Sequence, residues 1–295
     1  MPTDRHTRPP VHVFPYDVAA LDLLDADRAA ADAPTFEDFV AIVRRLRRDC
    51  PWDREQTHAS TAHLTLEEAY EVVDAVERGE SRALAAELGD LFLHVLFHAD
   101  IAETAGTFTL SDVMRAEMSK LVRRHPHVFG DEVVGGTGDV LRNWEAIKGA
   151  ERAEASRAGD APPSALDGVP AAMPALLRAE RVQHKAAAVG FDFPDAEGAW
   201  AKVAEETQEV RDALDADDAA ALESEIGDLL FAVVNVARMR GVVPETALRG
   251  TVARFSRRFR HVEAGLAARG RTTQEATLAE MDALWDEAKR LGVGR

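Results

Sequence analysis

The sequence predicts an all-α protein made of two tandem, duplicated helical-bundle domains. Apolar residues recur at the spacing of one helix face through most of the 295 residues. The alternation that is typical of β-strands is almost absent, and aromatic residues make up only 6% of the chain. Several blocks of residues also occur twice in the same order, which indicates an internal duplication.

Helix starts and stops divide the first half of the chain. Residues 1–33 contain several prolines and an Ala/Asp run, so we expect an N-terminal extension of uncertain structure. An apolar helical face begins after Thr35 and is broken near Pro51. A long helix is then expected to pass through Glu67 and to end near Gly79. Three more helices are expected at about 81–105, 110–124 and 138–153.

A segment rich in glycine, proline and serine separates the two halves. We expect residues 155–170 to be a linker between an N-terminal helical domain, 34–154, and a C-terminal helical domain, 171–295. Helical periodicity resumes after this segment. Five helices are expected at about 171–189, 196–214, 218–240, 244–268 and 273–291.

Two sets of five carboxylates share the pattern E-E-x-x-E, a gap, then E-x-x-D. The first set is Glu67, Glu68, Glu71, Glu87 and Asp90. The second set is Glu205, Glu206, Glu209, Glu225 and Asp228. Each member of the second set lies 138 residues after its counterpart. Like charges at helical spacing repel one another, so the repeated pattern indicates that a cation holds each set together.

The spacing of these acids predicts a metal site between two helices. Glu67 and Glu71 share one helix face, and Glu87 and Asp90 share a face of the next helix. If the two helices pack antiparallel through the short connection around Gly79, the carboxylates converge. Oxygen-only clusters suit Mg²⁺, with Mn²⁺ as a possible substitute, and this many carboxylates favours two or more ions per site.

An apolar run follows the aspartate of each E-x-x-D motif. Asp90 is followed by Leu91, and Asp228 is followed by Leu229. We therefore expect both aspartates to lie against the core, which disfavours the alternative of a merely solvated acidic face.

Charge and cysteine content limit the partners and the compartment. The net charge of -17 argues against nucleic-acid binding, because a phosphate backbone requires a basic surface. No apolar run approaches the roughly 20 residues of a membrane span, so no membrane partner is expected. Cys50 is the single cysteine and cannot form an internal disulfide, which favours a cytoplasmic location.

Two histidines follow the first E-x-x-D motif at helical spacing. His94 and His98 have no match in the second half, and we expect them to line the core or a pocket, with a contact to the nucleotide base as the alternative. A di-iron bundle would use E-x-x-H motifs on two helices. The only such pattern joins Glu55 to His58, in a region broken by proline and tryptophan, so this alternative is disfavoured.

Characteristic blocks flank both acid motifs. They are Cys50-Pro51-Trp52-Asp53-x-x-Gln56-Thr57, Thr65-Leu66-Glu67-Glu68-Ala69-Tyr70-Glu71, Glu87-Leu88-Gly89-Asp90-Leu91, Val189-Gly190-Phe191-Asp192 and Glu225-Ile226-Gly227-Asp228-Leu229-Leu230-Phe231. With the paired motifs, these blocks resemble the MazG family of nucleoside triphosphate pyrophosphohydrolases in its two-domain form. The resemblance runs from about residue 35 to the C-terminus. The acid motif alone is shared with related all-α pyrophosphatases, including dimeric dUTPases.

The resemblance implies hydrolysis of a nucleoside triphosphate to the monophosphate and pyrophosphate. It also implies that the motif acids bind Mg²⁺ and that the protein is a homodimer. Metal ions would neutralise the triphosphate and activate a water molecule. An acid that is not fully committed to metal would accept the proton of that water, and Glu68 and Glu206 are the candidates.

Basic, amide and aromatic residues are the candidates for contacts with the nucleotide. Lys202 lies three residues before Glu205, on the face of the second acid motif, and Glu205 is a candidate for both metal and substrate binding. The resemblance places further nucleotide contacts at Arg254, Arg257, Arg258 and Trp285. Asn235 and Arg238 follow the second motif at helical spacing and are candidates to line a base pocket. The matching candidates in the first half are Lys120, Arg123, Arg124 and Trp144.

The two halves differ in the polar groups around the acids. Leu64, Phe97 and Asp100 stand in the first half where the second has a lysine, an asparagine and an arginine. We therefore expect the C-terminal half to be the more active one. Two alternatives stay open: a dUTPase-like enzyme with a single substrate, and a non-catalytic metal-binding scaffold or regulator.

Overall fold

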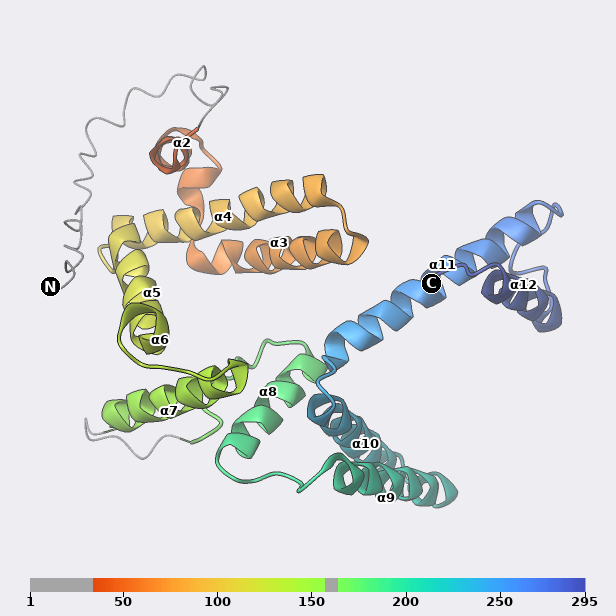
Figure 1. The fold of residues 1–295 in the computed structure, drawn as a ribbon. Helices are drawn as coiled ribbons and strands as arrows, with labels where there is room; N and C mark the ends of the chain where they lie inside the picture. The colour runs from red at the N-terminus through yellow and green to blue at the C-terminus, as the bar shows by residue number, and fades with distance from the viewer. Residues whose placement is uncertain (1–33, 157–163, 295) are drawn as a thin grey trace, which may run out of the picture. The chain divides into compact units, whose positions relative to one another are not determined.

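The computed structural model describes residues 34–156 and 164–294 and confirms the all-α prediction, because no strand occurs among these residues (Figure 1). The chain divides into two compact units, 1–144 and 145–295, and the division falls within helix α7 (Thr137–Ser156). The predicted extension over 1–33 and residues 157–163 of the predicted linker lie outside the described residues.

An antiparallel hairpin of two long helices forms the centre of unit 1. Helix α3 (His58–Arg78) and helix α4 (Ser81–Thr104) pack along each other. Gly79 ends α3 in the left-handed conformation, with φ of 70°, which a residue with a Cβ adopts at a cost. The expected helix end at this glycine is therefore confirmed.

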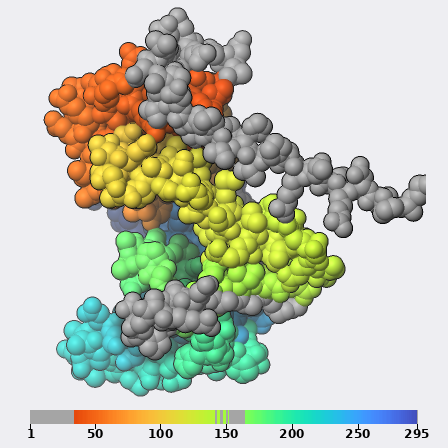
Figure 2. Space-filling view, turned by 90° about the vertical axis from the view of Figure 1, so that its left-hand side faces the viewer, coloured from red at the N-terminus to blue at the C-terminus, as the bar shows by residue number. Residues whose placement is uncertain are grey.

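Helix α2 (Phe36–Asp49) covers one side of α4 and supplies half of the core of unit 1. The buried residues of this core are Val40, Val43, Leu96, Phe97 and Ile101. In the space-filling view of Figure 2, the orange and yellow helices of this unit lie in contact with one another. A capping box at Thr35 begins α2 at the predicted position, because its side chain accepts a hydrogen bond from the Asp38 amide.

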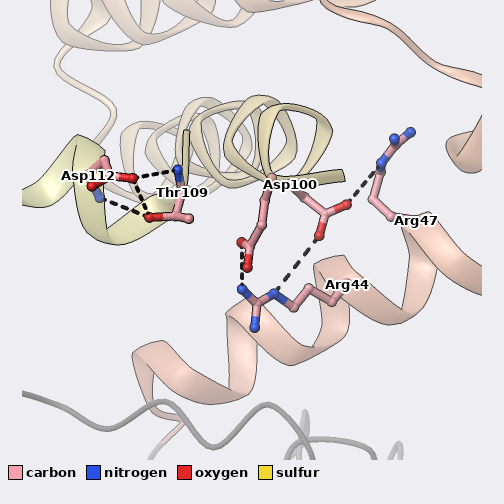
Figure 3. A network of polar contacts seen from close by, with 6 residues as sticks. Arg44, Arg47, Asp100, Thr109 and Asp112 are labelled. Carbon is pink, nitrogen blue, oxygen red and sulfur yellow. Dashed lines mark hydrogen bonds and ion pairs between the residues drawn. The ribbon is translucent and has the colours of Figure 1, made fainter. Parts of the chain in front are cut away.

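The remaining elements of unit 1 are shorter. Helix α5 (Leu110–Arg124) begins at a capping box between Thr109 and Asp112 (Figure 3). A 3₁₀ turn (Asp53–Glu55) and a four-residue helix α6 (Pro126–Phe129) were not predicted from the sequence. Elements of one turn have no apolar periodicity, so the sequence pattern does not indicate them.

A network of ion pairs ties α2 to α4 (Figure 3). Asp100 on α4 lies 3.2 Å from Nε of Arg47 and 3.9 Å from Nε of Arg44. Arg44 also pairs with Glu103 at 2.8 Å, and the Arg47 guanidinium lies 5.0 Å from the ring centre of Phe97. Burial raises the pKa of the Asp100 carboxyl, and the two arginines act against that rise.

Unit 2 contains a second hairpin of the same kind. Helix α9 (Ala196–Asp215) and helix α10 (Ala219–Met239) pack along each other, and helix α8 (Ala175–Ala188) packs against α10 and α11. Helix α11 (Pro244–Ala267) extends away from this pair, and helix α12 (Leu278–Arg290) packs on its far part (Figure 1). Val262, Leu266 and Leu284 form the core of the α11–α12 pair.

Two helices of unit 2 begin later than the sequence pattern predicts. Helix α8 begins after Pro174 instead of near residue 171, because a proline favours the start of a helix. Helix α12 begins after Thr277 instead of near 273, because Thr277 and Glu280 form a capping box. None of the described helices is long and apolar enough to cross a membrane.

The Asp100 network gives a stability prediction. Replacing Asp100 by alanine leaves Arg47, whose side chain is only 9% exposed, without its carboxylate partner. We expect urea unfolding of unit 1 to show a loss of about 2 kcal/mol. The control is Asp49→Ala, which removes an exposed pair with Arg48 and should cost clearly less than Asp100→Ala. Equal losses in the two variants would contradict a stabilising role for the network.

Candidate metal and nucleotide site

The α3–α4 hairpin brings three acids of the first motif together. Glu68 and Glu71 lie on one face of α3, three residues apart, and Glu87 lies on the facing side of α4. One carboxylate oxygen from each lies within 4.8 Å of the others. The hairpin that the sequence predicted therefore produces convergence of the acids.

The α9–α10 hairpin brings three acids of the second motif together. Carboxylate oxygens of Glu206, Glu225 and Asp228 lie within 4.8 Å of one another. Glu206 is buried, with 4% of its surface exposed, and is the only buried acid among the described residues. The neighbouring Glu209 belongs to the same group, because it is hydrogen bonded to Glu206.

The expectation that Asp90 and Asp228 lie against the core is wrong. Both aspartates are exposed, while the following Leu91 and Leu229 are half-buried. An apolar run on a helix does not determine the direction of the residue before it, since adjacent residues point about 100° apart. Both aspartates are open to solvent, and Asp228 is the exposed member of the acid cluster of unit 2, where a cation in solution can reach it.

Burial and mutual repulsion raise the pKa of two acids in unit 1, Glu68 and Glu71. The pKa of Glu71 is raised by the charge of Glu87, then by burial and by a hydrogen bond to Glu87. The pKa of Glu68 is raised by burial and then by the charges of Glu71 and Asp90. Glu67 is exposed and contributes to the same repulsion.

An internal ammonium partly neutralises the acids in unit 2. Nζ of Lys202 lies 2.5 Å from Glu206 and 2.9 Å from Glu205. The hydrogen bond from Lys202 lowers the pKa of Glu206, and the same contacts raise the pKa of Lys202. The hydrogen bond to Glu206 raises the pKa of Glu209. The expected position of Lys202 on the face of the acid motif is confirmed.

The donor sets fit hard divalent cations. Each cluster offers several carboxylate oxygens, and Mg²⁺ and Mn²⁺ prefer oxygen ligands. Separations below 4.8 Å allow several of these oxygens to share one ion or to bridge two. The repulsion described above would be relieved by such a cation, so the charge balance of both hairpins also fits one.

Histidines accompany the acids in unit 1 alone among the described residues. Nε2 of His94 lies 4.0 Å from Glu68. Nδ1 of His98 lies 2.9 Å from Nδ1 of His58, and its Nε2 lies 3.1 Å from the Thr65 hydroxyl. His58, the exposed first residue of α3, stacks on His98.

Asn235 and Arg238 lie together on α10. Both Nε and an Nη of Arg238 donate to Oδ1 of Asn235, at 3.0 and 2.6 Å. The same guanidinium pairs at 2.5 Å with Asp192, in the loop before α9. The side chain of Arg238 is only 7% exposed, so it lies behind Asn235 and not in open solvent.

The basic run and Trp285 lie on the α11–α12 pair. The Arg258 guanidinium lies 5.9 Å from the centre of the Trp285 ring and donates to the carbonyl of Val293. Arg254 donates to the Thr251 hydroxyl, and Arg257 is exposed on the same helix. Within unit 2, α12 and the part of α11 that it covers stand apart from α9 and α10 (Figure 1). One chain thus groups these residues but does not bring them to the acids.

The matching residues of the first half lie on α5 and α7. Lys120 pairs with Glu117 on the exposed side of α5. Arg123 and Arg124 form the last turn of α5. Trp144 on α7 contacts His125, with ring centres 5.8 Å apart.

Comparison with known proteins shows the family. The model of the MazG nucleotide pyrophosphohydrolase domain matches residues 56–129 and 196–263, one copy on each acid hairpin. A nucleoside triphosphate pyrophosphohydrolase from Escherichia coli K12 is 45% identical over 259 residues, which cover 85% of this chain and 96% of that protein. The chain belongs to the MazG family.

Two further relatives extend the comparison. The Thermotoga maritima nucleoside triphosphate pyrophosphohydrolase/pyrophosphatase MazG is 40% identical over 258 residues, covering 86% of this chain and 95% of that protein. Bacillus subtilis YabN, named as uncharacterized, is 44% identical over 257 residues, which are 51% of its length. The two-domain MazG resemblance found in the sequence is therefore confirmed.

Two contacts of this MazG chain were missed by sequence reasoning. Asp192 was noted only as part of a flanking block, and its pairing with Arg238 spans 46 positions. The sequence predicts a core or pocket position for His94, and its half-buried side chain agrees with this, but its contact with Glu68 was not predicted. No local spacing relates either pair, although the unmatched histidine in the first half was a visible signal.

The acid clusters predict stabilisation by divalent cations. We expect Mg²⁺ at about 100 times its Kd to stabilise each hairpin against unfolding by about 2.7 kcal/mol. Glu87→Gln should remove this effect from unit 1, and Glu225→Gln should remove it from unit 2. Differential scanning calorimetry with Mg²⁺ and with EDTA measures both. The matched control is Glu223→Gln, an exposed acid on α10 outside the cluster, which should keep the full effect.

Proposed function

We propose that this chain is a Mg²⁺-dependent hydrolase that converts nucleoside triphosphates to the monophosphate and pyrophosphate, with the C-terminal unit the more active. The relatives from E. coli and T. maritima carry the name of this activity over nearly their whole length. The observation that supports the proposal most directly is the convergence of Glu206, Glu225 and Asp228 at the α9–α10 crossing. A triphosphate needs such a cation site to lie beside an acidic protein of net charge -17.

The residues of unit 2 can take separate roles in metal binding, phosphate binding and proton transfer. Glu225, Asp228 and Glu209 would hold Mg²⁺, which supplies charge neutralisation of the phosphates and acidification of a bound water. Lys202 would donate to a phosphate oxygen once the cation competes with it for Glu205. Glu206 is ionised because Lys202 lowers its pKa, so it can accept the proton of the attacking water. Glu68 has the matching place in unit 1.

The difference between the units supports an unequal division of activity. The position of Asn235 is occupied in unit 1 by Phe97, which is buried under the Arg47 guanidinium. Asp100 is held by ion pairs to α2 (Figure 3), so this end of the first hairpin is closed by protein. Leu64 in place of Lys202 also leaves the first cluster without an internal ammonium. We therefore propose a weaker or differently selective site in unit 1.

A homodimer is part of the proposal, and exposed apolar stripes support it. Leu88, Phe92 and Val95 form a stripe at helical spacing on α4, and all three are exposed. The matching residues on α10 are exposed as well, and they are Ile226, Leu230 and Val233. Stripes of this kind favour burial against another surface. A second copy of the chain would also offer its basic α11–α12 pair, which lies apart from the acids within one chain.

We propose nucleotide-pool house-cleaning in the cytoplasm as the role, because removal of excess or non-standard nucleotides needs no nucleic-acid or membrane partner. The competing possibilities make different predictions in one assay. A dUTPase-like enzyme would release pyrophosphate from one nucleotide in a panel of canonical, deaminated and oxidised triphosphates. A metal-binding scaffold would release none.

Two matched substitutions test the activity and its asymmetry. Glu209→Ala removes a proposed metal ligand from unit 2 and should lower kcat/KM for pyrophosphate release at least about 100-fold. Glu71→Ala makes the same change in unit 1 and should retain most of the activity. EDTA should stop pyrophosphate release by the unaltered chain. Loss of activity in Glu71→Ala with full activity in Glu209→Ala would show that the asymmetry is assigned to the wrong unit.

Charge placed in the apolar stripe tests the dimer. Leu230→Glu should shift the chain from dimer to monomer in sedimentation velocity, because an unpaired carboxylate would be buried in the interface. Val133→Glu adds the same charge at a fully exposed position in unit 1 and should leave the sedimentation coefficient unchanged. A monomeric unaltered chain at micromolar concentration would overturn the dimer proposal.

A further inference from the structure

The loop between α8 and α9 contacts helix α10 through an ion pair between Asp192 and Arg238. Gly190 follows α8 with φ of 89°, and the Phe191 amide donates back to the Ala186 carbonyl at 3.0 Å. This turn sends the next residue, Asp192, toward α10, where it meets Arg238. The block Val189-Gly190-Phe191-Asp192 thus has a structural task that the acid chemistry does not explain.

Helix α8 is itself fixed on α10, which gives the loop a defined position. The buried side chain of Gln183 on α8 donates to the Phe231 carbonyl of α10 at 2.8 Å. Asp192 also accepts a hydrogen bond from the amide of Phe193 at 2.9 Å, which holds its carboxylate in one orientation. The carboxylate is therefore positioned before any ligand binds.

The guanidinium of Arg238 donates hydrogen bonds to protein side chains. Its guanidinium is more than nine-tenths buried, and such a group requires partners for its charge and its N–H groups. Asp192 supplies the negative charge, and Oδ1 of Asn235 accepts two of the N–H groups. Arg238 is thus a rigid connection between the loop and Asn235.

The hydrogen bonds from Arg238 determine which atoms of the Asn235 side chain can bind a ligand. Its Oδ1 already accepts two hydrogen bonds from Arg238, so the amide nitrogen must point the other way. Among the residues that the structure describes, this Nδ2 has no hydrogen-bond partner, and the side chain is half-buried. Asn235 therefore presents donors and no acceptor.

These donors lie on the same helix face as the acids. Asn235 follows Asp228 by seven residues, which is two turns of α10 and about 10 Å along its axis. A nucleotide whose phosphates meet the cation at Asp228 would extend its nucleoside along this face toward Asn235. In unit 1 the matching residues are Phe97 and Asp100, so no donor of this kind exists at that place.

We propose that Asp192 and Arg238 are positioning residues that fix Asn235 as a hydrogen-bond donor to the nucleoside end of the substrate. The recognised atom is an acceptor, either on the base or on the sugar. The assignment rests on the proposed function, and it makes Arg238 a support for the Asn235 contact instead of a residue that itself lines the base pocket.

A substitution at Asp192 tests the proposal without touching the acids. The substrate is whichever of ATP, GTP, CTP, UTP and their deoxy forms the unaltered chain hydrolyses fastest with Mg²⁺. For Asp192→Asn we expect KM to rise about tenfold with kcat within about threefold, since one binding contact loses its orientation. Asp192→Glu keeps the charge and should recover most of the loss. Asp215→Asn removes an exposed charge at the end of α9 and should behave as the unaltered chain.

Inorganic tripolyphosphate separates positioning from a general structural effect. It has the phosphates but no nucleoside, so its Mg²⁺-dependent Kd should be unchanged in Asp192→Asn. Equal weakening of tripolyphosphate and nucleotide, or an unchanged nucleotide KM, would overturn the proposal. If Asp192→Asn does not fold, Asn235→Asp replaces the donor by an acceptor of equal size. It should likewise raise the nucleotide KM and leave the Kd of tripolyphosphate unchanged. Failure of the proposed function is distinct, because the unaltered chain would then release no pyrophosphate from any of the nucleotides.

Discussion

Crowding of carboxylates at two helix crossings is the constraint on which the rest of the structure depends. Like charges a few ångströms apart repel one another, and each hairpin brings oxygens of three carboxylates within 4.8 Å. Tight connections keep the helices from separating: Gly79 has φ of 70° in the first, and Asp217 has φ of 54° in the second. The hairpins therefore hold a charge arrangement that isolated helices would not keep.

The two units relieve this repulsion in different ways. Unit 1 has raised pKa values at Glu68 and Glu71 and a histidine 4.0 Å from Glu68. Unit 2 has a lysine bonded to two of its acids. The helices that cover the hairpins also differ, since α2 closes over α4 with arginines while the loop after α8 brings an aspartate to α10. The duplication thus preserved the acid skeleton, and the surrounding contacts diverged.

Sequence patterns predicted what depends on local spacing and missed what depends on tertiary contact. The long helices, the hairpin at Gly79 and the position of Lys202 follow from periodicity, caps and i,i+3 geometry. The exposure of Asp90 did not follow, because the direction of one residue depends on which helix lies opposite. The pairing of Asp192 with Arg238 joins a loop to a helix, and only the packing of α8 on α10 creates it.

The lysine of unit 2 couples two binding events. While Lys202 is bonded to Glu205 and Glu206, its ammonium donates to two protein carboxylates. A cation bound to Glu205, as proposed, would compete with the ammonium and free it to meet a phosphate. In the proposed mechanism, loading would be ordered by charge exchange: the cation would come first, and its arrival would free the second positive group for an anionic ligand. Unit 1 has Leu64 at that position, so the same exchange could not occur there.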